Sequence, residues 1–274
     1  MAAAIGLALA VPALAHAGAG SEAKRPGQAG PVAGASIIGG GAADPARWPF
    51  AAAILREGRL HCGGSVIAPT KVLTAAHCVL GFDRSSLRVA TGRARLAEST
   101  AGQMSPVVGA AIHPDYRTTL RHDVAVLTLA SPSTATPIAL PSPADAAAFT
   151  TPGRQLRVSG WGARNPFGGS LAKILMKTTE KIRTNRRCKR VYRSVFSGKA
   201  MICAYGRRLR RFKWISIHTT GCSGDSGGAL VGDSPTGPVA IGLVSYGSFI
   251  CGFGGTPTVY ARVSDALDFI QSEL

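Results

Sequence analysis

Acidic residues are scarce in this chain of 274 residues. It has 14 Asp and Glu against 31 Lys and Arg, which gives a formal net charge of +17. The few acids do not cluster as a calcium-binding loop would require, so no calcium site is predicted. The excess of positive charge favours solubility and a basic surface that attracts anions. Specific nucleic-acid binding is not predicted, because no nucleic-acid-reading motif accompanies the charge.

Long apolar runs are absent except at the start of the chain. Residues 2–15 are almost wholly apolar, but the run is too short to span a bilayer. It is typical of a secretory signal, although no Lys or Arg precedes it. We therefore expect residues 1–17 to be a signal peptide and the small, polar stretch 18–36 to be a pro-segment. The mature protein is then expected to be secreted.

The six cysteines lack any C-x-x-C spacing, which disfavours a zinc site, and no metal is predicted. In an exported chain they predict disulfides instead. Six cysteines allow many pairings, and their spacing alone does not choose among them.

Short apolar runs bounded by Gly, Pro or charged residues favour an all-β barrel or sandwich. Apolar residues make up 46% of the chain, which is enough for a packed core. Ser131–Pro152 is rich in Pro, Ala, Ser and Thr and is expected to connect two halves. Val263–Leu274 has helical spacing with Ser264 as its expected N-cap. The expected strands include 51–55, 64–67, 87–90, 124–129, 156–159 and 240–244.

Three segments carry the chemistry of the chain. Residues 221–228 read Gly-Cys-Ser-Gly-Asp-Ser-Gly-Gly, in which Ser226 is ringed by glycines that let backbone N–H groups approach one oxygen. Upstream lie Leu-Thr-Ala-Ala-His-Cys, ending at Cys78, and the run that begins with Asp123. The order His, Asp, Ser and these three motifs resemble the trypsin/chymotrypsin family of serine proteases, over about Ile37 to Leu274.

The resemblance implies two antiparallel β-barrels, 37–145 and 146–274, with the active site between them and a helix at the C-terminus. It also implies three disulfides, Cys62–Cys78, Cys188–Cys203 and Cys222–Cys251. The family acts on proteins or peptides without a cofactor, and we expect a monomer.

A serine hydroxyl is a weak nucleophile that needs a neighbouring base, and the base needs a group to orient it. Ser226 is therefore expected to be the nucleophile, His77 the general base and Asp123 the carboxylate that fixes the imidazole. Asp123 begins an apolar strand, where an unpaired carboxylate would be costly to bury. The backbone N–H groups of Gly224 and Ser226 are expected to form the oxyanion hole.

Ile37-Ile38-Gly39-Gly40 resembles the activation site of the family. A new ammonium at Ile37 would pair with Asp225 and order the oxyanion loop, which makes the chain a zymogen. Ser36, which precedes the cut, does not suit a trypsin-like activator, and self-activation is a hypothesis. The alternative is that Ile37–Gly40 is only the first strand of a permanently folded enzyme.

The resemblance also locates the specificity pocket. Thr220 occupies its floor, where an Asp would select Lys or Arg, while Gly247 and Thr258 match its walls. Ser245, Tyr246 and Gly247 resemble the segment that pairs with the substrate backbone as an added strand. We therefore predict cleavage after small or medium uncharged residues.

The segment Arg207–Lys213 is long and basic compared with the family pattern. It is either an exosite, which binds an acidic protein or an anionic surface, or simply a solvated loop.

Two other functions fit parts of the sequence. Gly224-x-Ser226-x-Gly228 also fits the α/β-hydrolase motif, but that fold needs a His after the Ser and none follows Ser226. A protease-like binding protein that acts through the basic loop stays open. If the chain is a protease, a neutral His77 and a charged Ile37 amine predict a neutral to mildly alkaline optimum.

Overall fold

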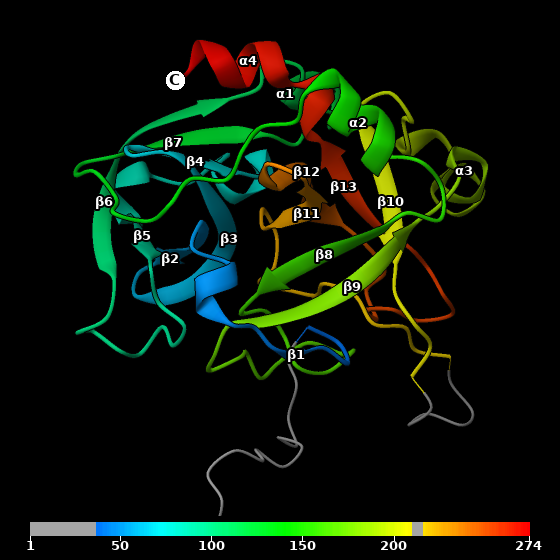
Figure 1. Ribbon diagram of the computed structural model, residues 1–274, viewed down its shortest axis with the longest axis horizontal. Helices are drawn as coiled ribbons and strands as arrows, with labels where there is room; N and C mark the ends of the chain where they lie inside the picture. The colour runs from blue at the N-terminus through cyan, green and yellow to red at the C-terminus, as the bar shows by residue number, and fades with distance from the viewer. Residues whose placement is uncertain (1–36, 210–215) are drawn as a thin grey trace, which may run out of the picture. The chain divides into compact units, whose positions relative to one another are not determined.

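Strands make up most of the regular structure in the computed structural model, which describes residues 37–209 and 216–274. The predicted signal peptide (1–17) and pro-segment (18–36) lie outside the described residues. Figure 1 follows the chain from the blue and cyan strands of the N-terminal half to the green, yellow and red elements of the C-terminal half. No helix within the described ranges has the length and apolar character needed to cross a membrane.

Six antiparallel strands close the first barrel in the order β2-β3-β4-β7-β6-β5. Ala52 and Ile54 of β2 face the interior of this barrel, while Ala51 and Ala53 belong to a core cluster shared with the second barrel. Both faces of β2 are therefore buried, so its sequence is apolar without alternation. The strands are β2 (Ala51–Arg56), β3 (Arg59–Ala68), β4 (Lys71–Thr74), β5 (Leu87–Thr91), β6 (Gln103–Ile112) and β7 (Ala125–Leu129).

The second barrel closes because β8 pairs with both β11 and β9. The predicted all-β class with two antiparallel barrels is confirmed. The short strand β1 (Gly41–Ala42) pairs with β9, so the start of the described chain joins this second barrel. The other strands are β8 (Gln155–Gly160), β9 (Met176–Ile182), β10 (Met201–Tyr205), β11 (Ala229–Ser234), β12 (Gly237–Tyr246) and β13 (Thr258–Arg262).

The helices are short. They are α1 (Tyr116–Thr119), α2 (Pro143–Phe149), α3 (Asn185–Tyr192) and α4 (Leu267–Ser272), with 3-10 turns η1 (Pro45–Arg47), η2 (Ala76–Cys78), η3 (Arg84–Ser86), η4 (Arg193–Val195) and η5 (Val263–Asp265). The expected N-cap at Ser264 is wrong, because Ser264 lies inside η5 and α4 begins only after Ala266. Helix α2 lies within the predicted connection and is started by a capping box between Ser142 and Asp145.

Contacts between the barrels fix the loop that contains Ser226. Gly63 N–H of β3 donates to Ser226 O at 2.7 Å, and Thr74 Oγ1 donates to Gly63 O at 2.8 Å. A Cβ at Gly63 would lie 3.2 Å from the backbone of Gly228, so a larger residue would push the barrels apart there.

The three expected disulfides are confirmed: Cys62–Cys78, Cys188–Cys203 and Cys222–Cys251. The first joins β3 to η2, which presents His77.

Candidate active site

The imidazole of His77 is held by Asp123 at two points. His77 lies on η2 just after β4, and Asp123 lies just before β7, which pairs with β4 through Thr74 and Ala125. His77 Nδ1 is 2.7 Å from Asp123 Oδ2, and His77 N–H donates to Asp123 Oδ1 at 2.9 Å. Strand pairing thus brings together two residues that are 46 positions apart in the sequence.

Asp123 is 3% exposed and stays ionised because donors surround it. Burial raises the pKa of its carboxyl, but the hydrogen bonds and charge of His77 and the hydrogen bond from Ser245 outweigh burial and hold the pKa below its ordinary value. Ser245 Oγ donates to Asp123 Oδ2 at 2.6 Å. When His77 Nδ1–H donates to this carboxylate, the neutral ring leaves a lone pair on Nε2, which can accept a proton.

Ser226 lies near His77 across the Cys62–Cys78 disulfide. Cys78 Sγ is 3.7 Å from both His77 Nε2 and Ser226 O, so the histidine and the serine share a neighbour. In the described structure Ser226 Oγ and His77 Nε2 do not form a hydrogen bond. Catalytic hydrogen bonds are often long in proteins without substrate and shorten in the complex.

Two free amides flank the Ser226 hydroxyl. The N–H groups of Asp225, Gly227 and Gly228 donate to backbone carbonyls at 2.8 to 2.9 Å. Those of Gly224 and Ser226 donate to no group in the described part of the chain. The left-handed backbone of Gly224, at φ +93°, suits a residue without a Cβ. These two donors are the pair that the sequence predicted for the oxyanion hole.

Asp225 is fully buried and turns away from the serine. Gly162 N–H donates to its Oδ1 at 2.8 Å and Cys222 N–H to its Oδ2 at 2.9 Å. Burial raises the pKa of this carboxyl to about 6, because it outweighs the two hydrogen bonds. A Cβ at Gly162 would lie 2.5 Å from Asp225 Oδ2, so glycine is required there.

The predicted activation segment packs against the chain leading to Asp225. Ile37 is fully buried, and Ile38 N–H donates to Thr220 O at 3.0 Å. Thr220 precedes Gly221, where a Cβ would lie 3.7 Å from Asp225 Cβ. The structure therefore brings the two members of the predicted activation pair into one region.

The pocket beside Ser226 has a volume of about 130 Å³. The predicted residues Ser245, Tyr246, Gly247 and Thr258 line it. Thr220 does not line it but lies fully buried behind Thr258, with their hydroxyl oxygens 2.6 Å apart. The hydroxyl of Thr258, predicted as a wall residue, therefore faces the pocket where Thr220 was predicted to form the floor.

Sequence reasoning missed Glu180, which lies fully buried in β9 behind this floor. Gly221 N–H donates to its Oε1 at 3.2 Å, while its Oε2 has no hydrogen-bond partner in the described chain. Burial raises the pKa of Glu180 to about 7 against the opposing effects of Tyr260, Gly221 and Thr220. The sequence signal for its inward orientation was its place between the outward-facing Thr179 and Lys181, because successive residues of a strand face opposite sides of the sheet.

The sequence also gave no role to His113 and His122, and the structure shows that His122 has partners. His122 Nε2 is 2.7 Å from Asp265 Oδ2, and its ring stacks on His113 with centroids 4.5 Å apart. His122 precedes Asp123, so this contact ties the start of β7 to the C-terminal segment. His113, Asp115 and His122 are spaced closely enough to hold a metal ion.

Of the predicted basic loop Arg207–Lys213, only Arg207, Arg208 and Leu209 are described, and residues 210–213 lie outside the described residues. Leu209 packs against Ile38, Ala163 and Ile217.

Comparison with known proteins agrees with this geometry. A family model described as Trypsin matches residues 37–270. The chain is 34% identical over 243 residues to "Trypsin" of Saccharopolyspora erythraea, covering 87% of this chain and 98% of that protein. It is 34% identical over 257 residues to "Transmembrane protease serine 9" of Rattus norvegicus, covering 90% of this chain and 23% of that protein. It is 32% identical over 242 residues to "Glucanase inhibitor protein 2" of Phytophthora infestans, covering 86% of this chain and 88% of that protein.

Replacing Ser245 with alanine tests whether its hydroxyl positions Asp123. A hydrogen bond to a charged group contributes about 1.5–3 kcal/mol, so kcat/KM for a peptide substrate should fall at least tenfold. KM should change little, because the backbone of Ser245 is retained. The control Ser234→Ala removes a hydroxyl in the β11–β12 hairpin and should leave the kinetics unchanged. Equal kinetics for the two variants would remove Ser245 from the site.

Proposed function

The chain belongs to the trypsin family of serine proteases, and we propose that it is a secreted endopeptidase, made as a zymogen, that cleaves peptide bonds through Ser226, His77 and Asp123. The main support is the double contact by which buried Asp123 holds His77, which shares the neighbour Cys78 with Ser226 of the pocket. The two free amides at Gly224 and Ser226 add a site for negative charge.

The proposed reaction follows from these positions. His77 Nε2 takes the proton of Ser226 Oγ as this oxygen attacks the substrate carbonyl carbon, and the carbonyl oxygen becomes an oxyanion. The Gly224 and Ser226 N–H groups stabilise that oxyanion, each by about 3 kcal/mol in the barrier. The imidazolium, stabilised by Asp123, then protonates the leaving amine. Water, deprotonated by His77, releases the acyl group from Ser226.

A protease-like binding protein is the second candidate. It is favoured by the similarity to "Glucanase inhibitor protein 2", a protein named for inhibition rather than for cleavage. Retention of His77, Asp123 and Ser226 in one arrangement argues against it, because binding alone does not require a base beside a serine.

A fluorophosphonate probe separates the two candidates. A chain produced with Ile37 as its first residue should be labelled, because His77 activates Ser226. Ser226→Ala should abolish labelling, whereas Ser223→Ala in the same loop should keep it. Mass spectrometry of the labelled peptide identifies the serine. A folded but unlabelled protein would favour the binding function.

Two features support activation by cleavage before Ile37. Ile37 has φ +50° in the intact chain, a left-handed conformation that costs a β-branched residue about 1–3 kcal/mol. Cleavage frees its nitrogen from the preceding carbonyl and removes that restriction. The buried Asp225 carboxylate lacks a cationic partner in the described chain, and a new ammonium at Ile37 would supply one.

The pH dependence of stability tests this activation model. Burial raises the pKa of Asp225 from 3.8 to about 6 in the intact chain. Unfolding should therefore become easier as pH rises from about 4 to about 6, because the unfolded state releases the proton first. The loss is at most about 3 kcal/mol. A chain starting at Ile37 should lose less, since its ammonium stabilises the ionised carboxylate.

Denaturant titrations at pH 4 and pH 7 on the two forms, both with Ser226→Ala, measure this difference. Both forms should also carry Glu180→Gln, because Glu180 interacts electrostatically with Asp225 and would titrate differently in the two forms. Identical pH slopes would contradict the pairing of Ile37 with Asp225.

We propose that the pocket accepts small or medium uncharged side chains and prefers those that end in a hydrogen-bond donor. Thr258 is the floor residue that faces the pocket, and Thr220 connects it to the carboxyl of Glu180. When Glu180 is ionised it accepts from Thr220, which in turn accepts from Thr258. The Thr258 oxygen then presents its remaining lone pair to the substrate.

Isosteric substrates test this preference. The ratio of kcat/KM for substrates with Thr and with Val before the cut should rise about fivefold between pH 6 and pH 8.5. The reason is that Glu180, with a pKa of about 7, ionises in this range, and one hydrogen bond contributes about 1 kcal/mol. Glu180→Gln should make the ratio independent of pH. The control Glu98→Gln changes a half-exposed side chain far from the pocket and should preserve the rise. A flat ratio in the unmodified enzyme would remove Glu180 from the specificity mechanism.

A further inference from the structure

A second and larger cavity lies on the second barrel and shares no lining residue with the pocket at Ser226. It is a groove of about 640 Å³. Five cationic side chains line it, and no Asp or Glu in the described chain does. These cations are Arg157, Lys177, Lys181, Arg183 and Arg207.

The cations share one face of the sheet because of strand alternation. In β9, Lys177, Thr179 and Lys181 face outward, while Met176, Glu180 and Ile182 are buried. The outward residues of β8 lie opposite them, with Arg157 across from Thr179 and Gln155 across from Lys181. Cross-strand partners share a face of the sheet, so these side chains form one continuous surface.

Glycines keep the groove open at one end. Gly41 of β1 lies opposite Lys177, and no atom lies within 4 Å of the position its Cβ would take. Gly39 and Gly40 also line the groove, so the segment that follows Ile37 forms one wall without side chains.

Four of the five cations lack an acidic partner within the described residues. Arg157 pairs with Asp233, but Lys177, Lys181, Arg183 and Arg207 make no ion pair. Such clustering of like charge destabilises the folded chain unless an anion compensates it.

Arg183 is also held in place before any ligand arrives. Its guanidinium carbon lies 3.6 Å from the centroid of the Tyr205 ring, and a terminal nitrogen donates to Tyr205 O at 3.4 Å. Its buried Nε has no acceptor among the described residues. An oriented guanidinium suits an oxyanion, because its planar fork matches sulfate or phosphate oxygens.

We propose that this groove binds the sulfate groups of an extended sulfated polysaccharide. Lys177 and Lys181 are four strand residues apart, about 13 Å, so the positive charge is spread along a line rather than gathered around one ion. Among the described residues no aromatic side chain lines the groove, so they offer no stacking platform of the kind that single-stranded nucleic acids use. Arg207 also lines the groove, so the anion site joins this residue to the outward face of β9.

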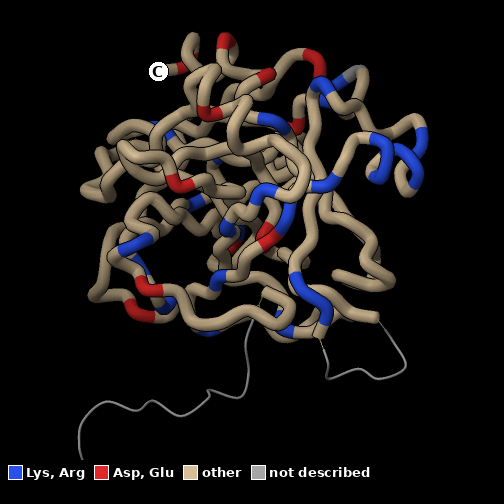
Figure 2. The backbone as a smooth tube through the Cα atoms, turned by 45° about the vertical axis from the view of Figure 1, so that its right-hand side comes forward, with Lys and Arg blue, Asp and Glu red and all other residues tan. Residues whose placement is uncertain are grey.

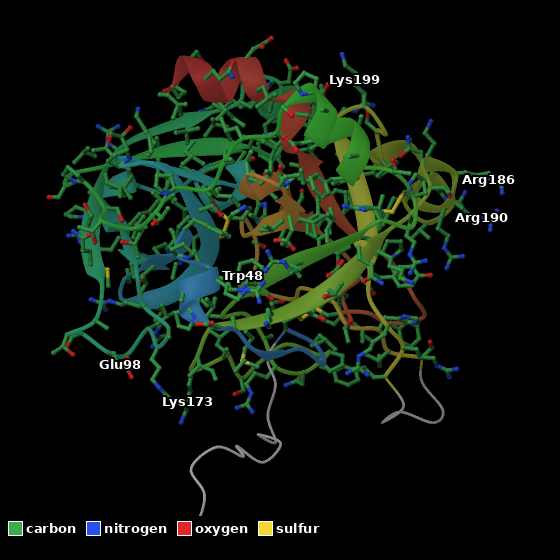
Figure 3. The ribbon with its side chains drawn as sticks, in the orientation of Figure 1. Trp48, Glu98, Lys173, Arg186, Arg190 and Lys199 are labelled. Atoms are coloured by element: carbon green, nitrogen blue, oxygen red, sulfur yellow. A yellow bond between two sulfur atoms is a disulfide. The ribbon has the colours of Figure 1, made fainter. Side chains whose placement is uncertain are left out.

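The cations of α3 provide a matched control. Figure 3 shows Arg186 and Arg190 projecting from this helix into solvent, and neither lines the groove. In Figure 2 the blue Lys and Arg positions gather densely around α3. If net charge alone attracted polyanions, α3 would attract them as well as the groove does.

The test is binding of a heparin octasaccharide to the full chain carrying Ser226→Ala, which prevents self-digestion and makes the result independent of the proposed protease function. Lys177→Thr/Lys181→Thr should weaken binding at least tenfold at moderate salt. It should also reduce the slope of log Kd against log salt by about two, one for each lost cation contact. Arg186→Gln/Arg190→Gln, with the same loss of charge, should change Kd less than twofold. Thermal unfolding checks that both proteins are folded.

If Lys177→Thr/Lys181→Thr does not fold, Arg207→Gln tests the proposal instead, because Arg207 is exposed and lies outside the strands. Arg207→Gln should raise Kd about threefold. Equal weakening by the groove and α3 variants would overturn the proposal in favour of non-specific attraction. Tighter binding of an oligothymidylate or a polyglutamate of equal charge would also overturn it, by assigning the groove to another class of polyanion.

Discussion

Buried carboxylates need donors, and much of the architecture around the pocket supplies them. Asp123 is satisfied by His77 and Ser245 and Asp225 by the amides of Gly162 and Cys222, whereas the amide of Gly221 satisfies only Oε1 of Glu180. An unsatisfied buried charge would cost several kcal/mol. The glycines near Asp225 follow from this need, because a Cβ at position 162 would overlap the carboxylate that its amide must reach.

The three buried acids lie apart from the exposed cations of this basic protein. Among the described residues, the buried carboxylates are Asp123, Glu180 and Asp225, all close to the pocket, whereas no Lys or Arg among them is buried. Cations on β9 therefore find few acidic partners, which leaves the groove electropositive. On this one strand the inward Glu180 faces the pocket floor and the outward Lys177 and Lys181 face the groove. Alternation along β9 thus places its acid and its two outward lysines on opposite faces of the sheet.

The parts predictable from sequence were those in which local chemistry has few solutions. Strands such as Ala51–Arg56 and Leu87–Thr91 were predicted by short apolar runs between turn residues. The neighbourhoods of His77, Asp123 and Ser226 were predicted by motifs whose backbone demands are narrow. Ser264 failed as a helix cap because burial of Val263 and Ile270 and the hydrogen bond that Asp265 accepts from His122 favour a 3-10 turn there. Glu180 was missed because its burial depends on contacts from β13 and the Gly221 loop.

The sequence by itself determined the all-β class, the three disulfide pairs implied by the family resemblance and the residues expected to carry the chemistry. Only the tertiary structure decided that Asp123 contacts His77 at two points and that Thr220 lies behind Thr258 rather than in the pocket. It also decided that four cations without an ion pair among the described residues meet in one groove. The physical reason is the distance along the sequence over which each interaction acts. Strand propensity and turn chemistry act over a few residues, whereas hydrogen bonding, burial and charge compensation depend on which distant segments the closed barrels bring into contact.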